Sequence, residues 1–309
     1  MAQAAHRGDG LMAARIASLL PSVTEIVCAL GLGDRLVARS HECDFPPWVT
    51  SLPAVTASRL PADAVTQAEV DAAVTAAAQA GAALYSLDIE LLARLAPDLV
   101  VTQSLCDVCA VDEGLALGAV ERMDAPARLL SLSPGRLDEV IAAVGEVAVA
   151  AGEPARGEDL MQALRARLDA LHARVDGHPR VRVAAVEWID PPWSAGHWVP
   201  DQVAAAGGEE VLAQPGGRSA RMTWDDVRSA RPDVVVLMPC GLSLAETLAL
   251  ARDVPPLPCR VAAVDASGLF SRPGPRLVDG AEVLARMLHP LPGDPPAGDA
   301  WAWVDEASG

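Results

Sequence analysis

The segment from Pro97 to Cys109, PDLVVTQSLCDVC, sets the organisation of this 309-residue chain. A run of apolar residues follows the Pro-Asp turn and leads directly into a Cys-x-x-Cys sequence, which predicts a buried strand with two thiols at its carboxyl end. The second half repeats this pattern as PDVVVLMPC over residues 232–240, and a helical pattern precedes each copy. A unit of helix, turn, strand and cysteine that occurs twice indicates a duplicated fold.

Hydrophobic patterns predict the other main elements. Short apolar runs that predict strands occupy residues 15–20, 36–39, 128–132, 180–186 and 260–264. Because helical runs alternate with these strands, both sheets are expected to be parallel. The longest helical pattern covers residues 137–175, and Gly152 to Ala155 interrupts it as a kink or tight break. We therefore expect an α/β protein with two Rossmann-like lobes bridged by a long α-helix, and a ligand cleft between the lobes.

These patterns divide the chain into five segments. They are a disordered leader (1–11), an N-terminal α/β lobe (12–136), the bridging helix (137–178), a C-terminal α/β lobe (179–290) and a loose tail (291–309). In parallel α/β sheets, ligands bind in the crevice beyond the carboxyl ends of the strands. The residues that follow the strands are therefore the first candidates for a binding site.

Charge and hydropathy limit the partners of the chain. A net charge of −17 argues against nucleic acid or an anionic membrane surface, since both require a basic patch. No segment reaches the roughly 18 uncharged apolar residues of a membrane span. The apolar segment 11–20 contains Arg15 and lacks a small-residue cleavage site, so it predicts a strand and not a secretion signal. We expect a cytoplasmic monomer that binds a small molecule, without nucleic acid or membrane insertion.

The six cysteines support a second hypothesis. In a reducing compartment they are thiols or metal ligands in preference to disulfides. Four of them fall at predicted strand ends, namely Cys43, Cys106, Cys109 and Cys240. Four thiolates are the number of ligands that an iron–sulfur cluster or a zinc site requires, and His41 is an alternative ligand. Cys28 and Cys259 are expected to lie away from this group. Such a metal centre would have a sensing or redox role, and a thiol oxidoreductase built on the Cys-x-x-Cys pair is a third interpretation.

The loop after the first strand of the second lobe is rich in aromatic residues. Residues 187–200 read EWIDPPWSAGHWVP and contain three Trp and one His among residues that form turns. Core packing explains this pattern poorly, because turns lie at the surface. The loop therefore favours aromatic side chains that face a ligand.

Six features in this order resemble the class III solute-binding proteins, and most of all the cobalamin-binding proteins of vitamin B12 ABC importers. They are PSVTE (21–25), SHECDFPP (40–47), PDLV (97–100), the bridging helix, PPWSAG (191–196) and SRPGPR (271–276). The similarity covers about residues 15–288. It implies two lobes with little hinge closure, and a corrinoid or related metal chelate held edge-on by aromatic side chains.

The resemblance also implies a set of site residues. By position, the ligand-lining residues are Trp48, Trp193, Trp198, Phe270, Ser104 and Arg272. An ABC permease is the implied partner, docked through one acid on each lobe. Asp112 or Glu113 fits this role in the first lobe, but no acid lies between Asp265 and Asp279 in the second. We expect no catalysis, and a function in binding cobalamin or another corrinoid for ABC-type uptake or intracellular handling.

Overall fold

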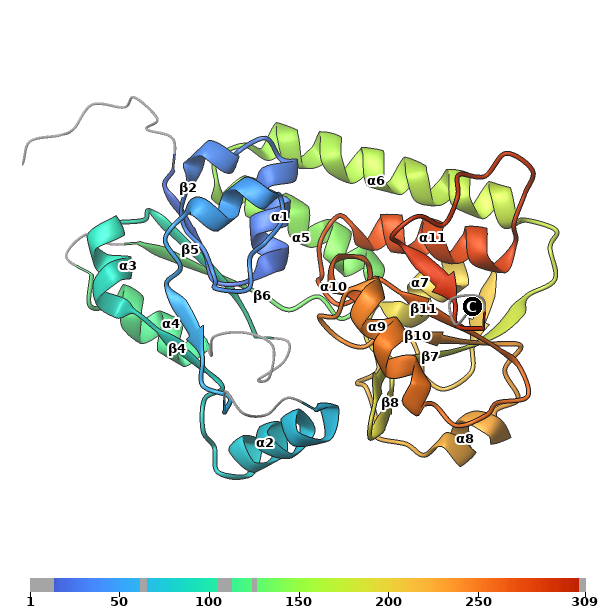
Figure 1. Cartoon of the computed structure of the whole chain (residues 1–309). Coiled ribbons are helices and arrows are strands. Elements are labelled where there is room, and N and C mark those ends of the chain that lie inside the picture. Colours follow the sequence, from blue (N-terminus) through green and yellow to red (C-terminus); the bar gives the residue numbers. More distant parts are fainter. Residues whose placement is uncertain (1–13, 62–65, 105–112, 124–126, 306–309) are drawn as a thin grey trace, which may run out of the picture.

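The structure is a computed structural model that describes residues 14–61, 66–104, 113–123 and 127–305. It contains two α/β lobes joined by helices, as Figure 1 shows, so the predicted fold class is confirmed. The expected leader, residues 1–11, lies outside the described residues. Within the described ranges, no helix is both long enough and apolar enough to cross a membrane.

The N-terminal lobe is built on a four-stranded parallel sheet in the order β2–β1–β5–β6. Its strands are β1 (Ile16–Ser18), β2 (Leu36–Ala38), β5 (Leu99–Gln103) and β6 (Arg128–Leu132). Its helices are α1 (Pro21–Ala29), α3 (Ile89–Leu95) and α4 (Glu113–Val120), with short 3-10 turns η1 (Gly33–Arg35) and η2 (Pro47–Ser51). Every residue of β5 is buried, which explains its uninterrupted apolar start.

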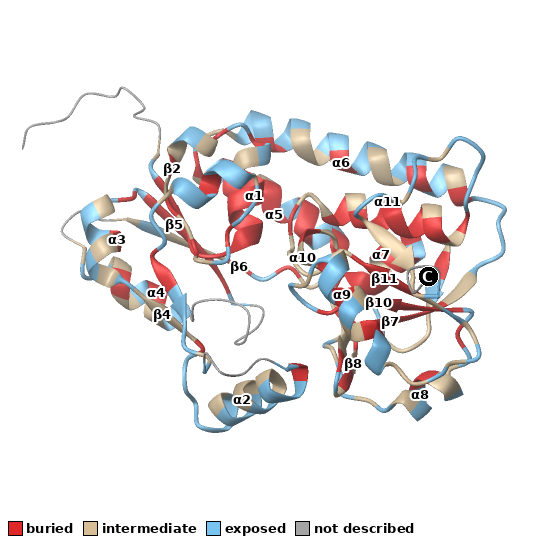
Figure 2. Cartoon of the chain, in the orientation of Figure 1, coloured by how far each residue is buried: buried red, intermediate tan, exposed pale blue. Residues whose placement is uncertain are grey.

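A small arm extends from this lobe. Strands β3 (Thr56–Ser58) and β4 (Tyr85–Leu87) pair antiparallel, and the chain between them carries helix α2 (Gln67–Gln79) away from the sheet (Figure 1). Thr66 and Glu69 form a capping box that fixes the start of the helix. Figure 2 shows that α2 is mostly exposed or half-buried, in contrast to the strands of both sheets, and Gln67 is its one buried residue. We call residues 66–79 the α2 arm.

The C-terminal lobe has a six-stranded sheet in which β9, β7, β10 and β11 are parallel. Its strands are β7 (Val181–Ile189), β8 (Pro192–Ser194), β9 (Gly208–Glu210), β10 (Val234–Leu237), β11 (Arg260–Val264) and β12 (Trp301–Trp303). Its helices are α7 (Val199–Ala205), α8 (Trp224–Ser229), α9 (Leu244–Leu250), α10 (Ala266–Leu269) and α11 (Leu277–Leu288), with a 3-10 turn η3 (Ala251–Asp253). Strands β8 and β12 add antiparallel to β7 and β11.

The duplication predicted from the two Pro-Asp segments is present in atomic detail. The strand order β2–β1–β5–β6 of the first lobe matches β9–β7–β10–β11 of the second. Asp98 accepts a hydrogen bond from the main-chain N–H of Arg15 (2.8 Å), and Asp233 accepts one from that of Arg182 (2.9 Å). The side chain of each arginine also donates to two main-chain carbonyls at the end of the helix that leads into the Pro-Asp segment. We call these two equivalent sites the arginine corners.

Two helices connect the lobes. Helix α5 (Leu137–Ala150) ends at the predicted interruption, where Gly152 has a φ of +78°, and α6 (Pro154–Val175) packs along it. The 22 residues of α6 span about 33 Å. Arg156 near its start donates to Leu30 of the N-terminal lobe (3.1 Å), and Arg174 near its end binds Asp294 of the C-terminal lobe. The bridging helix is therefore α6, with α5 as its partner.

The expectation of a loose tail is wrong for its described part. Residues Trp301–Trp303 form β12, which pairs antiparallel with β11. Both tryptophans pack, partly buried, against the C-terminal core, and the Arg260 guanidinium lies 3.4 Å from the Trp303 ring centroid. The Asp294 carboxylate accepts from both terminal nitrogens of Arg174, each at 2.7 Å. The Trp-Ala-Trp alternation is a strand pattern that was too short to predict from sequence.

Candidate functional site

Charged residues join the lobes at the carboxyl edges of their sheets. Glu25 of α1 accepts two hydrogen bonds from the Arg276 guanidinium, at 2.8 and 2.6 Å, and one from Arg272 at 3.2 Å. Arg272 also binds both carboxylate oxygens of Asp44, which follows β2, at 2.5 and 3.0 Å. Glu25 and Asp44 belong to the first lobe, and the two arginines belong to the second. We call these four residues the carboxylate–arginine cluster.

The charged groups of the cluster are largely shielded from solvent. Glu25 is only 4% exposed. Burial acts to lower the pKa of Arg272, but the hydrogen bonds and charges of Asp44 and Glu25 outweigh it and raise the pKa above its ordinary value. Burial likewise acts to raise the pKa of Asp44, and the contacts with Arg272 reverse the effect and lower it. Asp44 and Arg272 are therefore charged at neutral pH, and Arg272 is committed to tying the lobes together.

A small pocket of about 190 Å³ lies beside the cluster, between α1 and the loop around Pro275. Phe45 and Cys28 line it; Phe45 is 42% exposed, and the Arg276 guanidinium stands 4.0 Å from its ring centroid. Burial raises the pKa of Cys28 to about 11, with further contributions from Glu25 and Cys43. Phe45 was not among the predicted ligand-lining residues, although its place in the SHECDFPP motif was the signal that pointed to it.

The second contact between the lobes is made by the α2 arm. The indole N–H of Trp188 donates to the main-chain oxygen of Gln67 (3.3 Å), and that of Trp193 donates to Asp71 Oδ1 (3.1 Å). The Gln67 side-chain oxygen accepts from the main-chain N–H groups of Ile189 (2.8 Å) and Asp190 (3.1 Å). Trp188 and Trp193 are cross-strand partners in the β7–β8 hairpin. The arm therefore contacts the carboxyl end of β7 in the other lobe.

A third connection runs from the end of β6 to α7. Arg136 binds both carboxylate oxygens of Asp201, at 2.8 and 2.7 Å, and packs on Gly216. The loop from Gly216 continues along the β8 side of the lobe, where Arg221 lies 3.8 Å from Asp71 of the α2 arm. Carboxyl-end segments of both sheets thus face each other. This arrangement is the one in which parallel α/β sheets bind ligands.

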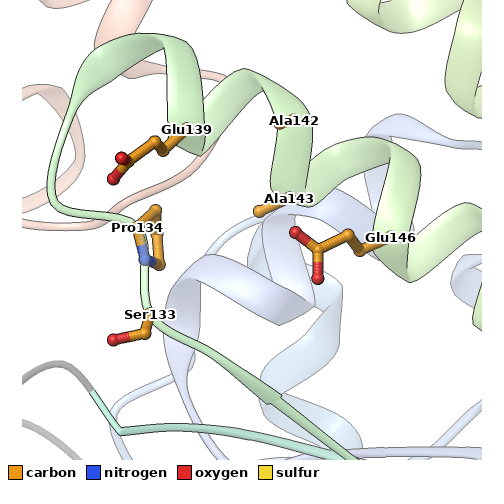
Figure 3. A pocket seen from close by; sticks show the side chains of 6 residues that line it. All are labelled: Ser133, Pro134, Glu139, Ala142, Ala143 and Glu146. Atoms are coloured by element: carbon orange, nitrogen blue, oxygen red, sulfur yellow. The ribbon is translucent and has the colours of Figure 1, made fainter.

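A pocket of about 330 Å³ lies at the start of α5, and Figure 3 shows the side chains that line it. Two carboxylates, Glu139 and Glu146, project from the helix, and Ser133 and Pro134 border the pocket from the preceding loop. The Glu139 carboxylate accepts from the main-chain N–H groups of Gly135 (2.7 Å) and Arg136 (3.1 Å). It therefore caps the helix, which is a sufficient reason for its presence.

The structure separates the predicted ligand-lining aromatic residues. Trp198 is 6% exposed and Phe270 is 2% exposed; both belong to the C-terminal core, where the Trp198 indole donates to the Phe270 carbonyl (2.7 Å). Their assignment to a ligand surface is corrected, because a covered ring offers no face to a ligand. Trp48 packs over Gly33 at the amino end of β2, away from the carboxyl edge. Trp193 alone of the four lies where the lobes meet, while Ser104 is exposed directly after β5.

The predicted metal ligands are only partly described. Cys106 and Cys109 lie outside the described residues. Cys43 is buried, burial raises its pKa, and its thiol lies 3.0 Å from Thr24 Oγ1. Cys240 is exposed. The ring nitrogen Nδ1 of His41 lies 2.7 Å from Thr56 Oγ1. Among the residues that the structure describes, no three His, Cys, Asp or Glu side chains form a group that could hold a metal ion. The four-cysteine site stays a prediction.

Comparison with known proteins gives a consistent result. The sequence profile of the family described as periplasmic binding protein matches residues 16–250. The vitamin B12-binding protein of Yersinia pestis (strain Pestoides F) is 23% identical over 283 residues, which are 91% of this chain and 88% of that protein. The corresponding protein of Yersinia pseudotuberculosis serotype O:3 (strain YPIII) has the same identity and coverage.

Solved structures share the fold. The periplasmic vitamin B12 binding protein BtuF of Vibrio cholerae superposes with a TM-score of 0.65 at 22% identity, over 89% of this chain and 97% of that one. The periplasmic heme-binding protein RhuT from Roseiflexus sp. RS-1 gives 0.64 at 24% identity with the same coverage. A periplasmic heme-binding protein from Pseudomonas aeruginosa gives 0.68 at 19% identity, over 94% and 98% of the two chains.

Proposed function

Because the chain belongs to the periplasmic binding protein family, we propose that it binds a corrinoid of the cobalamin type for ABC-type uptake or intracellular handling. The observation that carries the proposal is the similarity to vitamin B12-binding proteins over 91% of the chain. In the structure, the indole N–H groups of Trp188 and Trp193 both donate hydrogen bonds to the α2 arm, and both side chains are half-buried. Their ring surfaces suit apolar contact with a flat macrocycle.

Three groups of residues have separate roles in the proposed binding site. The carboxylate–arginine cluster keeps the lobes at a fixed separation, so that the site is preorganised and little binding energy is spent on closing it. Trp193 and Trp188 supply the apolar surface. Ser104, exposed at the carboxyl end of β5, offers a hydroxyl to the ligand from the first lobe.

Heme is the second candidate ligand. Two of the three solved structures compared above are heme-binding proteins by their names. Heme iron takes an axial ligand such as His or Tyr from the protein, and in this chain the rings of His41 and Tyr85 lie 5.6 Å apart. Cobalamin carries an axial base of its own, so that it does not depend on such a pair.

A titration distinguishes the two ligands. Purified protein is titrated with aquocobalamin and, separately, with hemin, followed by visible absorption and calorimetry. We expect saturable binding of aquocobalamin with a stoichiometry near one. Saturable binding of hemin, with no heat or spectral change for any corrinoid, would replace the corrinoid proposal with the heme alternative.

We also propose that the partner of the loaded protein is an ABC permease. Glu113, exposed at the start of α4, is the described acid that fits a docking role on the first lobe, while Asp112 lies outside the described residues. Binding of the purified protein to vesicles that contain the permease tests this step. Glu113→Gln should weaken that binding without changing corrinoid affinity.

A further inference from the structure

Gln67, the first residue of α2, holds an unusual position between the lobes. It is 8% exposed. Its side-chain oxygen accepts from two main-chain N–H groups, those of Ile189 and Asp190. A main-chain N–H can only donate, so the atom that faces both of them must be the amide oxygen. The other terminal atom, Nε2, is therefore the NH₂ group.

This NH₂ group is buried and has no hydrogen-bond partner among the residues that the structure describes. Native proteins leave few buried donors unpaired, because such a donor has lost its water and gained nothing in exchange. Packing does not account for it, since an apolar side chain of similar size would fill the same space without this cost. A partner that arrives from outside the chain does account for it.

The surroundings of Gln67 indicate the chemistry of that partner. The indole N–H groups of Trp188 and Trp193 are already occupied by acceptors on the α2 arm. Two charges beside the α2 arm, those of Asp71 and Arg221, lie 3.8 Å apart and offset each other, and the exposed Asp190 adds a carboxylate that repels acidic ligands. What remains for a ligand is aromatic ring surface beside one neutral N–H donor. This combination fits an apolar ring whose edge carries neutral carbonyl oxygens, as the corrin macrocycle does with its peripheral amides.

We propose that Gln67 is a specificity-determining residue that donates a hydrogen bond from Nε2 to a carbonyl oxygen of a peripheral amide of the ligand. This inference rests on the proposed corrinoid function. The oxygen of the same amide holds the β7–β8 hairpin, so one side chain both fastens the α2 arm to the second lobe and recognises the ligand. Because Nε2 is covered in this structure, the side chains that cover it shift when the ligand binds.

The variant Gln67→Glu tests the assignment. It retains an oxygen for Ile189 and Asp190 but replaces the NH₂ donor with an acceptor. Gln79→Glu makes the same chemical change at the exposed end of the same helix and is the matched control. Aquocobalamin titrations at pH 7.5 and thermal melts are measured for both variants and the wild type. We expect Gln67→Glu to bind about ten- to a hundredfold more weakly, while Gln79→Glu binds like the wild type.

Acidification provides a readout that a structural role would not produce. A protonated carboxyl has an O–H donor in the place of the lost NH₂, so the affinity of Gln67→Glu should recover towards that of the wild type as the pH is lowered to about 4.5. Equal affinity of Gln67→Glu and wild type at neutral pH would overturn the inference and leave the corrinoid proposal standing. Loss of affinity together with a lower melting temperature, without recovery in acid, would also overturn it. A wild type that binds no corrinoid would refute the proposed function itself, and the inference with it.

Discussion

Replacing Glu25 with Gln tests whether the carboxylate–arginine cluster holds the lobes together. The substitution preserves shape but removes the negative charge that accepts three hydrogen bonds from Arg272 and Arg276. Both guanidinium groups are mostly buried and stay charged, so they lose a partner that water replaces poorly. We expect a loss of stability that is localised at the boundary between the lobes.

The magnitude follows from the geometry. Removing one partner of a buried ion pair costs about 3–5 kcal/mol. Asp44 remains to bind Arg272, and the amide oxygen of the new side chain still accepts one hydrogen bond, so the lower end of this range applies. We therefore expect a loss of about 3 kcal/mol in the free energy of unfolding. That is a large share of the roughly 5–15 kcal/mol by which a protein is stable.

Urea denaturation followed by tryptophan fluorescence and circular dichroism measures this change. Glu90→Gln is the control, since Glu90 pairs with Arg94 on an exposed helix face at 4.0 Å and should contribute less than about 0.5 kcal/mol. If the cluster couples the lobes, the transition of Glu25→Gln should also separate into two steps. A loss below about 1 kcal/mol, together with a single transition, would show that the bridging helices and the other contacts hold the lobes together without the cluster.

Three further predictions concern the site and the core. Trp193→Ala should weaken aquocobalamin binding about tenfold in calorimetry, since a stacked ring is worth roughly 1 kcal/mol beyond its buried area. The control Trp48→Ala should leave the affinity unchanged, because Trp48 packs over Gly33 away from the boundary. Equal losses of affinity in the two variants would remove Trp193 from the site. Trp198→Ala should lower the free energy of unfolding by about 3 kcal/mol because it empties a core position; an unchanged urea midpoint would contradict its burial. Burial raises the pKa of Glu210 to about 8 from 4.5, so the folded state binds more protons than the unfolded state between these values and stability falls as pH rises through them. Glu210→Gln should reduce this loss, so that its stability depends less on pH between these values, and parallel pH profiles would refute the assignment.

Much of the fold was predictable because its strands are short apolar runs with clear ends. The strand predicted at residues 128–132 is β6 and that at 260–264 is β11, residue for residue. The break at Gly152 was also predictable, from its sequence Gly-Glu-Pro. Strand β12 was missed because it has only three residues and its stability comes from pairing with β11, which no local pattern reveals.

The candidate site was less predictable, since it depends on which residues meet across the lobes. Glu25 and Arg276 are 251 positions apart, and nothing in either motif shows that they form an ion pair. Trp193 and Trp198 belong to one aromatic segment, yet one lies at the boundary between the lobes and the other in the core, because Trp193 is in β8 and the chain turns before Trp198 at the start of α7. A sequence can show that such a loop is unusual, but the packing of the whole lobe decides which rings are covered. The four-cysteine hypothesis remains open, because two of its residues lie outside the described ranges.

The arginine corners have a consequence for protein engineering. Both corners sit at the amino edges of the sheets and have the same hydrogen bonds, whereas the described side-chain contacts at the carboxyl edges differ between the two lobes. The arginine corners, which support each lobe internally, are thus separated from the carboxyl-edge loops by the length of a strand. Carboxyl-edge loops that do not carry the carboxylate–arginine cluster can therefore be exchanged or randomised in a library while Arg15, Asp98, Arg182 and Asp233 are kept constant. The chain is in this sense a two-part scaffold whose recognition surface is interchangeable.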